Sequence, residues 1–251
     1  MIWAVIAVAP PGRGRLIVVG CRRTFGADAT RNVRNLATMP ILVTDFDGTF
    51  TRRDYFDLIL ERHDPPGARA LWDRFLAGGM TPFEGIAGVL GSLRTDHDGA
   101  ESLVAAMDVP PGAAAAARRL QAAGWEIVVA SAGCRWYIDR VLNGLELHFT
   151  VHANPGRFTP AEGVVMELDP QSPYFHPEMG LDKPAIVRAA LARDPIVAYA
   201  GDSALTDHPA AQLVAPSLRF ATGPLARRFA SEGVPYRPFM VWTEIAGALL
   251  D

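Results

Sequence analysis

Two aspartates stand two residues apart in the segment DFDGT, residues 45–49, directly after the apolar run 41–44. One carboxylate of such a pair can attack phosphorus as a nucleophile. The other can protonate the leaving oxygen and later take a proton from water. Asp45 and Asp47 can face one small site only if the chain turns, which Gly48 permits. Carboxylates this close repel each other unless a cation lies between them, so the pair predicts a hard divalent cation. A solvated turn that holds two acids is the alternative.

A hydroxyl group follows the second apolar run, residues 126–130. Ser131 and the backbone N–H groups of Ala132 and Gly133 would form an anion site if they open a helix. Serine is also an ordinary helix cap, so this segment alone does not separate the two interpretations.

Two later segments complete the set of candidate residues. Lys183 falls in the first turn of a predicted helix, where a cation opposes the helix dipole, so its place there requires a reason. Neutralising a phosphate and Asp45 would be one reason, and a surface lysine is the alternative. In the segment GDSALTD, residues 201–207, Asp202 can bind a hard cation through oxygen. Asp207, one helical turn further on, would support Lys183 or a metal-bound water; helix capping by Asp202 is the alternative.

Alternating strands and helices must position these groups. Apolar runs at 41–46, 126–130 and 196–200 predict buried strands, and helices are expected at 113–123, 182–192, 204–213, 225–232 and 241–250. This order predicts an α/β fold with a doubly wound parallel sheet. Ligands bind such sheets at the carboxyl ends of the strands, where the candidate residues stand. Segments 147–153 and 163–168 are interpreted as two short strands forming a hairpin.

Residues 54–106 have a helical pattern and separate the first strand from the rest. The spacing of Thr51 and Asp54 is that of a helix-capping box, which we prefer to a substrate role. Three aromatic residues, Tyr55, Trp72 and Phe83, are expected to form the core of this helical segment.

Composition excludes several classes of protein. The chain has 251 residues and a net charge of -3, which gives no reason to expect nucleic acid or an anionic membrane as a partner. Two cysteines are too few for a disulfide framework and fit a reducing, cytoplasmic location. No apolar run reaches the roughly 20 residues of a membrane helix. Residues 1–38 carry six arginines and one acid, and we interpret them as an extension outside the functional protein, with Met39 as its start.

The motifs at 45–49, 131, 183 and 202–207, in this order, resemble those of the haloacid dehalogenase-like phosphatases. The resemblance implies a Rossmann-like doubly wound core at 39–53 and 107–251, with a small helical cap at 54–106 inserted after the first strand. It also implies a Mg²⁺ cofactor, an aspartyl-phosphate intermediate and a small phosphorylated metabolite as partner, with the enzyme a monomer or homodimer. Asp47 argues against carbon–halogen cleavage, because members with that activity lack the second acid.

The family pattern assigns roles to matching residues of this chain. Asp45 is expected to be the nucleophile and Asp47 the general acid and base. The remaining expected roles are phosphate binding by Thr49, Ser131, Ala132, Gly133 and Lys183; metal binding by Asp45, Asp47 through its carbonyl, and Asp202; and support by Gly48, Ser203 and Asp207. Arg135 is either a pocket residue or a solvated helix residue.

Finer features resemble the phosphoserine phosphatase branch, and within it a group around a methionine-salvage phosphatase. That enzyme acts on 2-hydroxy-3-keto-5-methylthiopentenyl-1-phosphate. These features include the segments SAGCRWYI, residues 131–138, and GVPYRPF, residues 233–239. Phosphoserine phosphatase and phosphocholine- or phosphoethanolamine-type phosphatases are alternatives. A phosphotransferase and a non-catalytic phosphate-binding protein are the alternatives of another class.

Overall fold

The computed structural model describes residues 39–251, and the prediction for residues 1–38 lies outside the described residues. Within the described part, six parallel strands form one sheet in the order β10-β9-β8-β1-β2-β3. These strands are β1 (Ile41–Thr44), β2 (Glu126–Cys134), β3 (Thr150–Asn154), β8 (Val197–Gly201), β9 (Arg219–Ala221) and β10 (Arg237–Pro238). The prediction of a doubly wound parallel sheet is confirmed.

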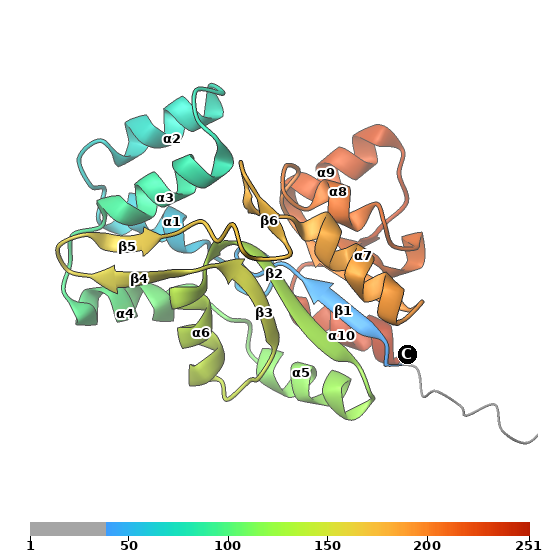
Figure 1. Ribbon diagram of the computed structural model, residues 1–251. Coiled ribbons are helices and arrows are strands. Elements are labelled where there is room, and N and C mark those ends of the chain that lie inside the picture. The colour runs from blue at the N-terminus through green and yellow to red at the C-terminus, as the bar shows by residue number, and fades with distance from the viewer. Residues whose placement is uncertain (1–38) are drawn as a thin grey trace, which may run out of the picture. The chain divides into compact units, whose positions relative to one another are not determined.

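Helices cover both faces of this sheet (Figure 1). Leu42 packs into the core cluster formed with α5 (Ala113–Ala122), α6 (Arg135–Gly144) and α10 (Trp242–Leu250). Its neighbours Ile41 and Val43 pack into the cluster formed with α7 (Lys183–Arg193), α8 (His208–Ala211) and α9 (Gly223–Glu232). Successive side chains of a strand point to opposite faces, so a strand buried on both must be continuously apolar, as β1 is.

The direction of winding reverses at β1. From β1 the chain adds β2 and then β3 on one side, and later β8, β9 and β10 on the other. Ile41 lies opposite Glu126 of β2 and Val197 of β8. A reversal of this kind leaves a crevice at the carboxyl ends of the two strands that flank it. The fold therefore places the ends of β1 and β8 at a natural ligand site.

Four helices fill the segment between β1 and α5, as predicted for residues 54–106. They are α1 (Tyr55–Arg62), α2 (Ala68–Leu76), α3 (Pro82–Ser92) and α4 (His97–Ala105). Helix α3 begins with a capping box, in which Thr81 and Glu84 satisfy each other's backbone N–H groups, and has Pro82 in its first turn. These local signals fix where the helix begins.

Two small hairpins follow β3, and they correct one prediction. Residues 150–154 are strand β3, paired in parallel with β2, so they form no hairpin with 163–168. The hairpin partner of β5 (Gly163–Met166) is β4 (Gly156–Thr159), and β6 (Phe175–His176) pairs with β7 (Gly180–Leu181). The Pro155-Gly156 pair marks the break between β3 and β4, because proline followed by glycine favours a turn.

Both hairpins contact the helical segment. Gly163 has φ +75°, and a Cβ atom there would lie 2.8 Å from the carbonyl oxygens of Leu90 and Leu93. Near the second hairpin, the backbone N–H of Phe83 in α3 donates a hydrogen bond of 3.0 Å to the carbonyl of Glu178. The helical segment is thus joined to residues 155–181 as well as to the chain on either side of it.

Candidate active site

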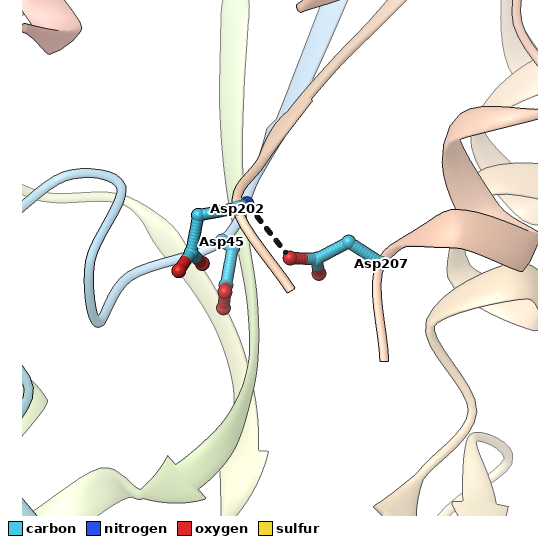
Figure 2. A group of neighbouring side chains, drawn as sticks. All are labelled: Asp45, Asp202 and Asp207. Carbon is cyan, nitrogen blue, oxygen red and sulfur yellow. Dashed lines mark hydrogen bonds between the residues drawn. The ribbon is translucent and has the colours of Figure 1, made fainter. Parts of the chain in front are cut away.

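Asp45 and Asp202 lie side by side at the ends of β1 and β8 (Figure 2). The Thr49 hydroxyl donates a hydrogen bond of 3.4 Å to Asp202. Gly48 makes this approach possible, because it has φ +68° and a Cβ atom there would lie 2.7 Å from Asp202 Oδ2. Only glycine combines this backbone conformation with so little space.

Lys183 lies between two carboxylates. Its Nζ is 2.8 Å from Asp45 Oδ1 and 2.6 Å from Asp207 Oδ1, and the side chain is only 2% exposed. Burial alone would lower the pKa of Lys183, but Asp207 and Asp45 together raise it. The surface-lysine alternative is therefore wrong, and the two carboxylates favour the protonated form of Lys183 beside Asp45.

Asp207 holds the loop after β8 together. Its Oδ1 also accepts a hydrogen bond of 2.7 Å from the Tyr199 hydroxyl. Its Oδ2 accepts from the backbone N–H groups of Asp202 and Ser203, at 3.0 and 2.8 Å. Residues 203–207 consequently form a turn, and the helix predicted at 204–213 begins only at His208. Asp207 was expected to support either Lys183 or a metal-bound water. In the structure it contacts Lys183.

Asp47 points toward Ser131, across the site from Lys183. Its carboxylate accepts hydrogen bonds from the Tyr55 N–H at 3.1 Å, the Tyr137 hydroxyl at 2.8 Å and the Ser131 hydroxyl at 3.4 Å. Burial raises the pKa of Asp47, and the bonds from Tyr55 and Tyr137 offset part of that rise. A carboxyl group that gains a proton more readily than usual suits a general acid.

The segment after Ser131 differs from its prediction. Strand β2 continues to Cys134, which pairs with Asn154 of β3 after a register shift, and helix α6 begins only at Arg135. The N–H groups of Ala132 and Gly133 therefore do not open a helix, and the Gly133 N–H donates to the Ser131 hydroxyl at 3.0 Å. The helix begins late because β2 continues to pair with β3, a strand that sequence reasoning had assigned to a hairpin. All three residues 131–133 still line the cavity.

Arg135 lies outside the site. Its guanidinium forms an ion pair with Asp139 at 3.1 Å, one helical turn away, and half of the side chain is exposed to solvent. Arg135 does not line the cavity. Of its two interpretations, the solvated helix residue is therefore the one that fits the structure.

Sequence reasoning gave Tyr137 no role, and for Asp54 it preferred a capping box to a substrate role. Asp54 precedes α1 but its side chain does not cap the helix, and Thr51 donates instead to the carbonyls of Phe46 and Arg53. The expected capping box is therefore wrong. The Asp54 carboxyl lines the cavity, and burial together with the charge of Asp47 raises its pKa well above the usual value. Tyr137 lies six residues after Ser131, and this spacing gave no signal of contact with Asp47.

A cavity of about 420 Å³ opens above these groups. We call its polar side the floor, defined as Asp45, Asp47, Ser131, Lys183 and Asp202. We call the opposite side the roof, defined as Phe56, Trp72, Phe75, Leu76, Pro82 and Ile86, all from α1 to α3. Two of the three aromatic residues expected in the core of the helical segment, Tyr55 and Phe83, do not line the cavity, but Trp72 does.

The floor suits a hard cation. Oxygen atoms of Asp45, Asp202 and Asp207 all lie within 4.8 Å of one another. Both oxygens of Asp207 already accept hydrogen bonds, which leaves Asp45 and Asp202 as the carboxylates able to bind an ion. Burial, with the charge of Asp207, raises the pKa of Asp45 to about 7, and burial with the charge of Asp45 raises that of Asp202 well above its usual value. A divalent cation would relieve this repulsion, and all-oxygen ligands fit magnesium.

Residues 42–212 match the haloacid dehalogenase-like hydrolase family, and this range contains every candidate residue described above. The chain belongs to this family. The enzyme class predicted from the sequence, a hydrolase, is confirmed by this match. Among curated proteins, the hydrolase is 26% identical over 175 residues to the bifunctional enzyme MtnB/MtnX of Bacillus licheniformis. The match covers 69% of this chain and 41% of that protein, so the hydrolase spans about two-fifths of its relative's length.

Solved structures share the fold of this hydrolase. A substrate-bound phosphoserine phosphatase is 16% identical with a TM-score of 0.59, and the match covers 83% of this chain and 97% of that one. A probable phosphoserine phosphatase from Vibrio cholerae is 17% identical with a TM-score of 0.61, with 84% of this chain and 64% of that one covered. The described residues include no helix that is both long and apolar enough to span a membrane.

Proposed function

We propose that this hydrolase is a magnesium-dependent phosphatase that forms an aspartyl-phosphate on Asp45. The observation that carries the proposal is the position of Asp45 at the switch point of the sheet, 2.8 Å from the buried cation of Lys183 and next to Asp202. Asp47, within reach of the same cavity, supplies a second carboxyl group with a raised pKa. The family match and the phosphatase folds above are consistent with this chemistry.

Two steps follow from this arrangement. In the first, an Asp45 carboxylate oxygen forms a bond to phosphorus while the ester P–O bond breaks, and Asp47 gives its proton to the departing alcohol oxygen. In the second, Asp47 takes a proton from water, the water oxygen bonds to phosphorus, and the Asp45–phosphate bond breaks to release phosphate. The groups assigned to the phosphoryl oxygens are Lys183, the hydroxyls of Ser131 and Thr49, and the N–H groups of Ala132 and Gly133.

Magnesium held by Asp45, Asp202 and the carbonyl of Asp47 would neutralise charge on the phosphoryl oxygens. Asp207 acts indirectly, by fixing Lys183 and the backbone of Asp202 and Ser203. Gly48 acts by leaving space beside Asp202.

The helical segment 54–106 is proposed to act as a cap over the substrate, and residues 39–53 with 107–251 as the catalytic core. As substrate class we propose small phosphate monoesters. Of the candidates that the sequence suggested, 2-hydroxy-3-keto-5-methylthiopentenyl-1-phosphate comes first, because segments 131–138 and 233–239 resemble the group around the phosphatase that acts on it. Phosphoserine and phosphocholine remain to be compared with it directly.

The test is release of phosphate from these three esters with Mg²⁺, using Asp45→Asn as the variant without a nucleophile. Asp98→Asn, the same substitution at an exposed position of α4, is the matched control. We expect Mg²⁺-dependent release by the wild type and Asp98→Asn, and loss in Asp45→Asn. After acid quenching, the peptide containing Asp45 should carry one phosphoryl group. Equal release by Asp45→Asn, or phosphate on another residue, would refute the proposal. Adding alcohols to the assay separates hydrolysis from phosphotransfer.

A further inference from the structure

The floor and the roof of the cavity differ completely in chemistry. The charged groups lining it are Asp45, Asp47, Asp54, Asp202 and Lys183, which all lie at or beside the floor. The six roof residues are apolar, three of them aromatic and three aliphatic. A bound ester must place its phosphoryl group at the floor, where the cation and the carboxylates are. The alcohol part of the ester then contacts the roof.

An anionic alcohol part finds no suitable partner there. Among residues 39–251, Lys183 is the one cation that lines the cavity, and its ammonium already contacts Asp45 and Asp207. The carboxylate of an amino-acid ester would therefore be desolvated against aromatic and aliphatic carbon, and the Asp54 carboxyl, which also lines the cavity, would repel it when ionised. An unpaired charge in such surroundings is strongly unfavourable.

The aromatic residues of the roof are also not arranged as a cage for a quaternary ammonium. Such a cage needs ring faces that are free to surround the cation. Here the ring centroids of Phe56 and Trp72 are 4.5 Å apart and those of Trp72 and Phe75 are 4.9 Å apart, so the rings cover one another. The other three roof residues, Leu76, Pro82 and Ile86, have no π-electrons to offer.

We infer that the cavity selects phosphate monoesters whose alcohol part has an apolar chain or ring and carries neither a carboxylate nor a quaternary ammonium group, and that Trp72 and Leu76 set this preference. The inference deepens the proposed function and rests on it for turnover, though not for binding. Trp72 is half-buried at the centre of the ring cluster. Leu76 and Leu205 both line the cavity, yet 67% and 48% of their surfaces are exposed to solvent. The apolar surface therefore continues to the cavity mouth.

The first measurement is the affinity of n-alkylphosphonates, from methyl to hexyl, for the Mg²⁺-loaded protein by calorimetry. Phosphonates cannot be hydrolysed, so the result does not depend on catalysis. Each added methylene group should tighten binding about fourfold until the cavity is full. Phosphonate analogues of phosphoserine and phosphocholine should bind no better than methylphosphonate. Affinity that does not change along the series, or tightest binding of either charged analogue, would overturn the inference.

Two variants connect the preference to the roof. Trp72→Ala should weaken hexylphosphonate about tenfold or more while leaving methylphosphonate within about twofold. Leu76→Lys places a cation at the mouth without disturbing buried packing, and should strengthen the carboxylate-bearing phosphoserine analogue about two- to fivefold relative to butylphosphonate. Asp73→Lys, an adjacent exposed position of α2 that does not line the cavity, is the matched control and should leave that ratio unchanged. Equal gains in both lysine variants would refute the role of Leu76.

The same esters are then tested for turnover. Hydrolysis of alkyl phosphates that rises with chain length supports both proposals. Hydrolysis without dependence on chain length contradicts the inference alone. Phosphonate affinity that rises with chain length, without hydrolysis of any ester, contradicts the proposed function and leaves the preference of the cavity established.

Discussion

The floor and the roof of the cavity are built in opposite ways. Floor residues lie in or close after the carboxyl ends of strands of one sheet or in the first turn of a helix, and their side chains are held by hydrogen bonds with defined partners. Roof residues come from three helices of the inserted segment and are held by packing of apolar surface. The difference suggests that the floor determines which bond is broken and the roof determines which molecule carries it. Substitutions in the two regions should therefore have different consequences.

The largest effect is expected from Lys183→Met, which leaves Asp45 and Asp207 as uncompensated charges in a buried site. Removing one partner of a buried ion pair costs about 3–5 kcal/mol, so both stability and activity should fall sharply. Asp207→Asn in the same chain removes one of the orphaned charges. The double variant should regain part of the unfolding free energy, measured in urea, without regaining activity. Full activity in Lys183→Met would contradict the role of the floor in breaking the ester bond.

Asp47→Asn separates activity from stability more cleanly. Loss of a general acid lowers kcat by about 10²–10⁴-fold, most for esters with poor leaving groups such as alkyl phosphates. Nitrophenyl phosphate, whose leaving group needs no proton, should be affected least. Tyr137→Phe is a milder variant, since it removes a 2.8 Å hydrogen bond that lowers the pKa of Asp47. Its kcat–pH profile should shift to higher pH, whereas a residue with only a packing role would leave the profile in place.

For the floor, the structure brings together residues that the sequence analysis had singled out, and their catalytic roles stay a prediction. Asp45, Asp47, Lys183 and Asp202 were identified because each stands at a fixed position after an apolar run or at a helix start, where local pattern and fold agree. The roof could not be identified in this way. Trp72 was expected in the core of the helical segment, since a helical pattern shows that a side chain faces inward but not what lies opposite.

Errors at the border between the two regions have one physical cause. Asp54 and Tyr137 reach the site through tertiary packing, and β3 was assigned to a hairpin because a ladder of five residue pairs with β2 leaves no signature in either strand alone. That one misassignment also explains why Ala132 and Gly133 were expected to open a helix. Parallel pairing joins distant segments, so its extent is not visible in local sequence.

Gly163→Ala tests how the roof is supported. Alanine at φ +75° is strained by about 1–2 kcal/mol, and its Cβ would also meet carbonyl oxygens of α3 at 2.8 Å, so the total should be about 2–4 kcal/mol. Gly112→Ala is the matched control, since it has φ +83° but open space around it, and only the strain should appear. Unfolding in urea measures both. Equal losses in the two variants would show that the close approach to α3 contributes nothing.

The effect of pH is the smallest over a single pH unit. Burial, and to a lesser extent the charge of Asp207, raises the folded-state pKa of Asp45 to about 7. The folded protein therefore binds more protons than the unfolded chain between about pH 4 and 7. Stability without magnesium should therefore fall as pH rises through this range, by at most about 1.4 kcal/mol per pH unit for each such carboxyl. Magnesium binds the ionised form, so its stabilising effect should grow over the same range. Thermal unfolding with Mg²⁺ or with EDTA at each pH measures this, and a Mg²⁺ effect that shrinks with rising pH would contradict it.

The hydrogen bond between Phe83 and Glu178, with the fit of Gly163 against α3, has a consequence for protein engineering. The helical segment is contiguous in sequence but is not an independent module, because residues 155–181 hold it from the side. A chimera that imports residues 54–106 alone from a relative would discard the matching surface of those hairpins. Exchange of substrate preference between relatives should therefore succeed only when both segments are transplanted together, although they lie about 50 residues apart in the chain.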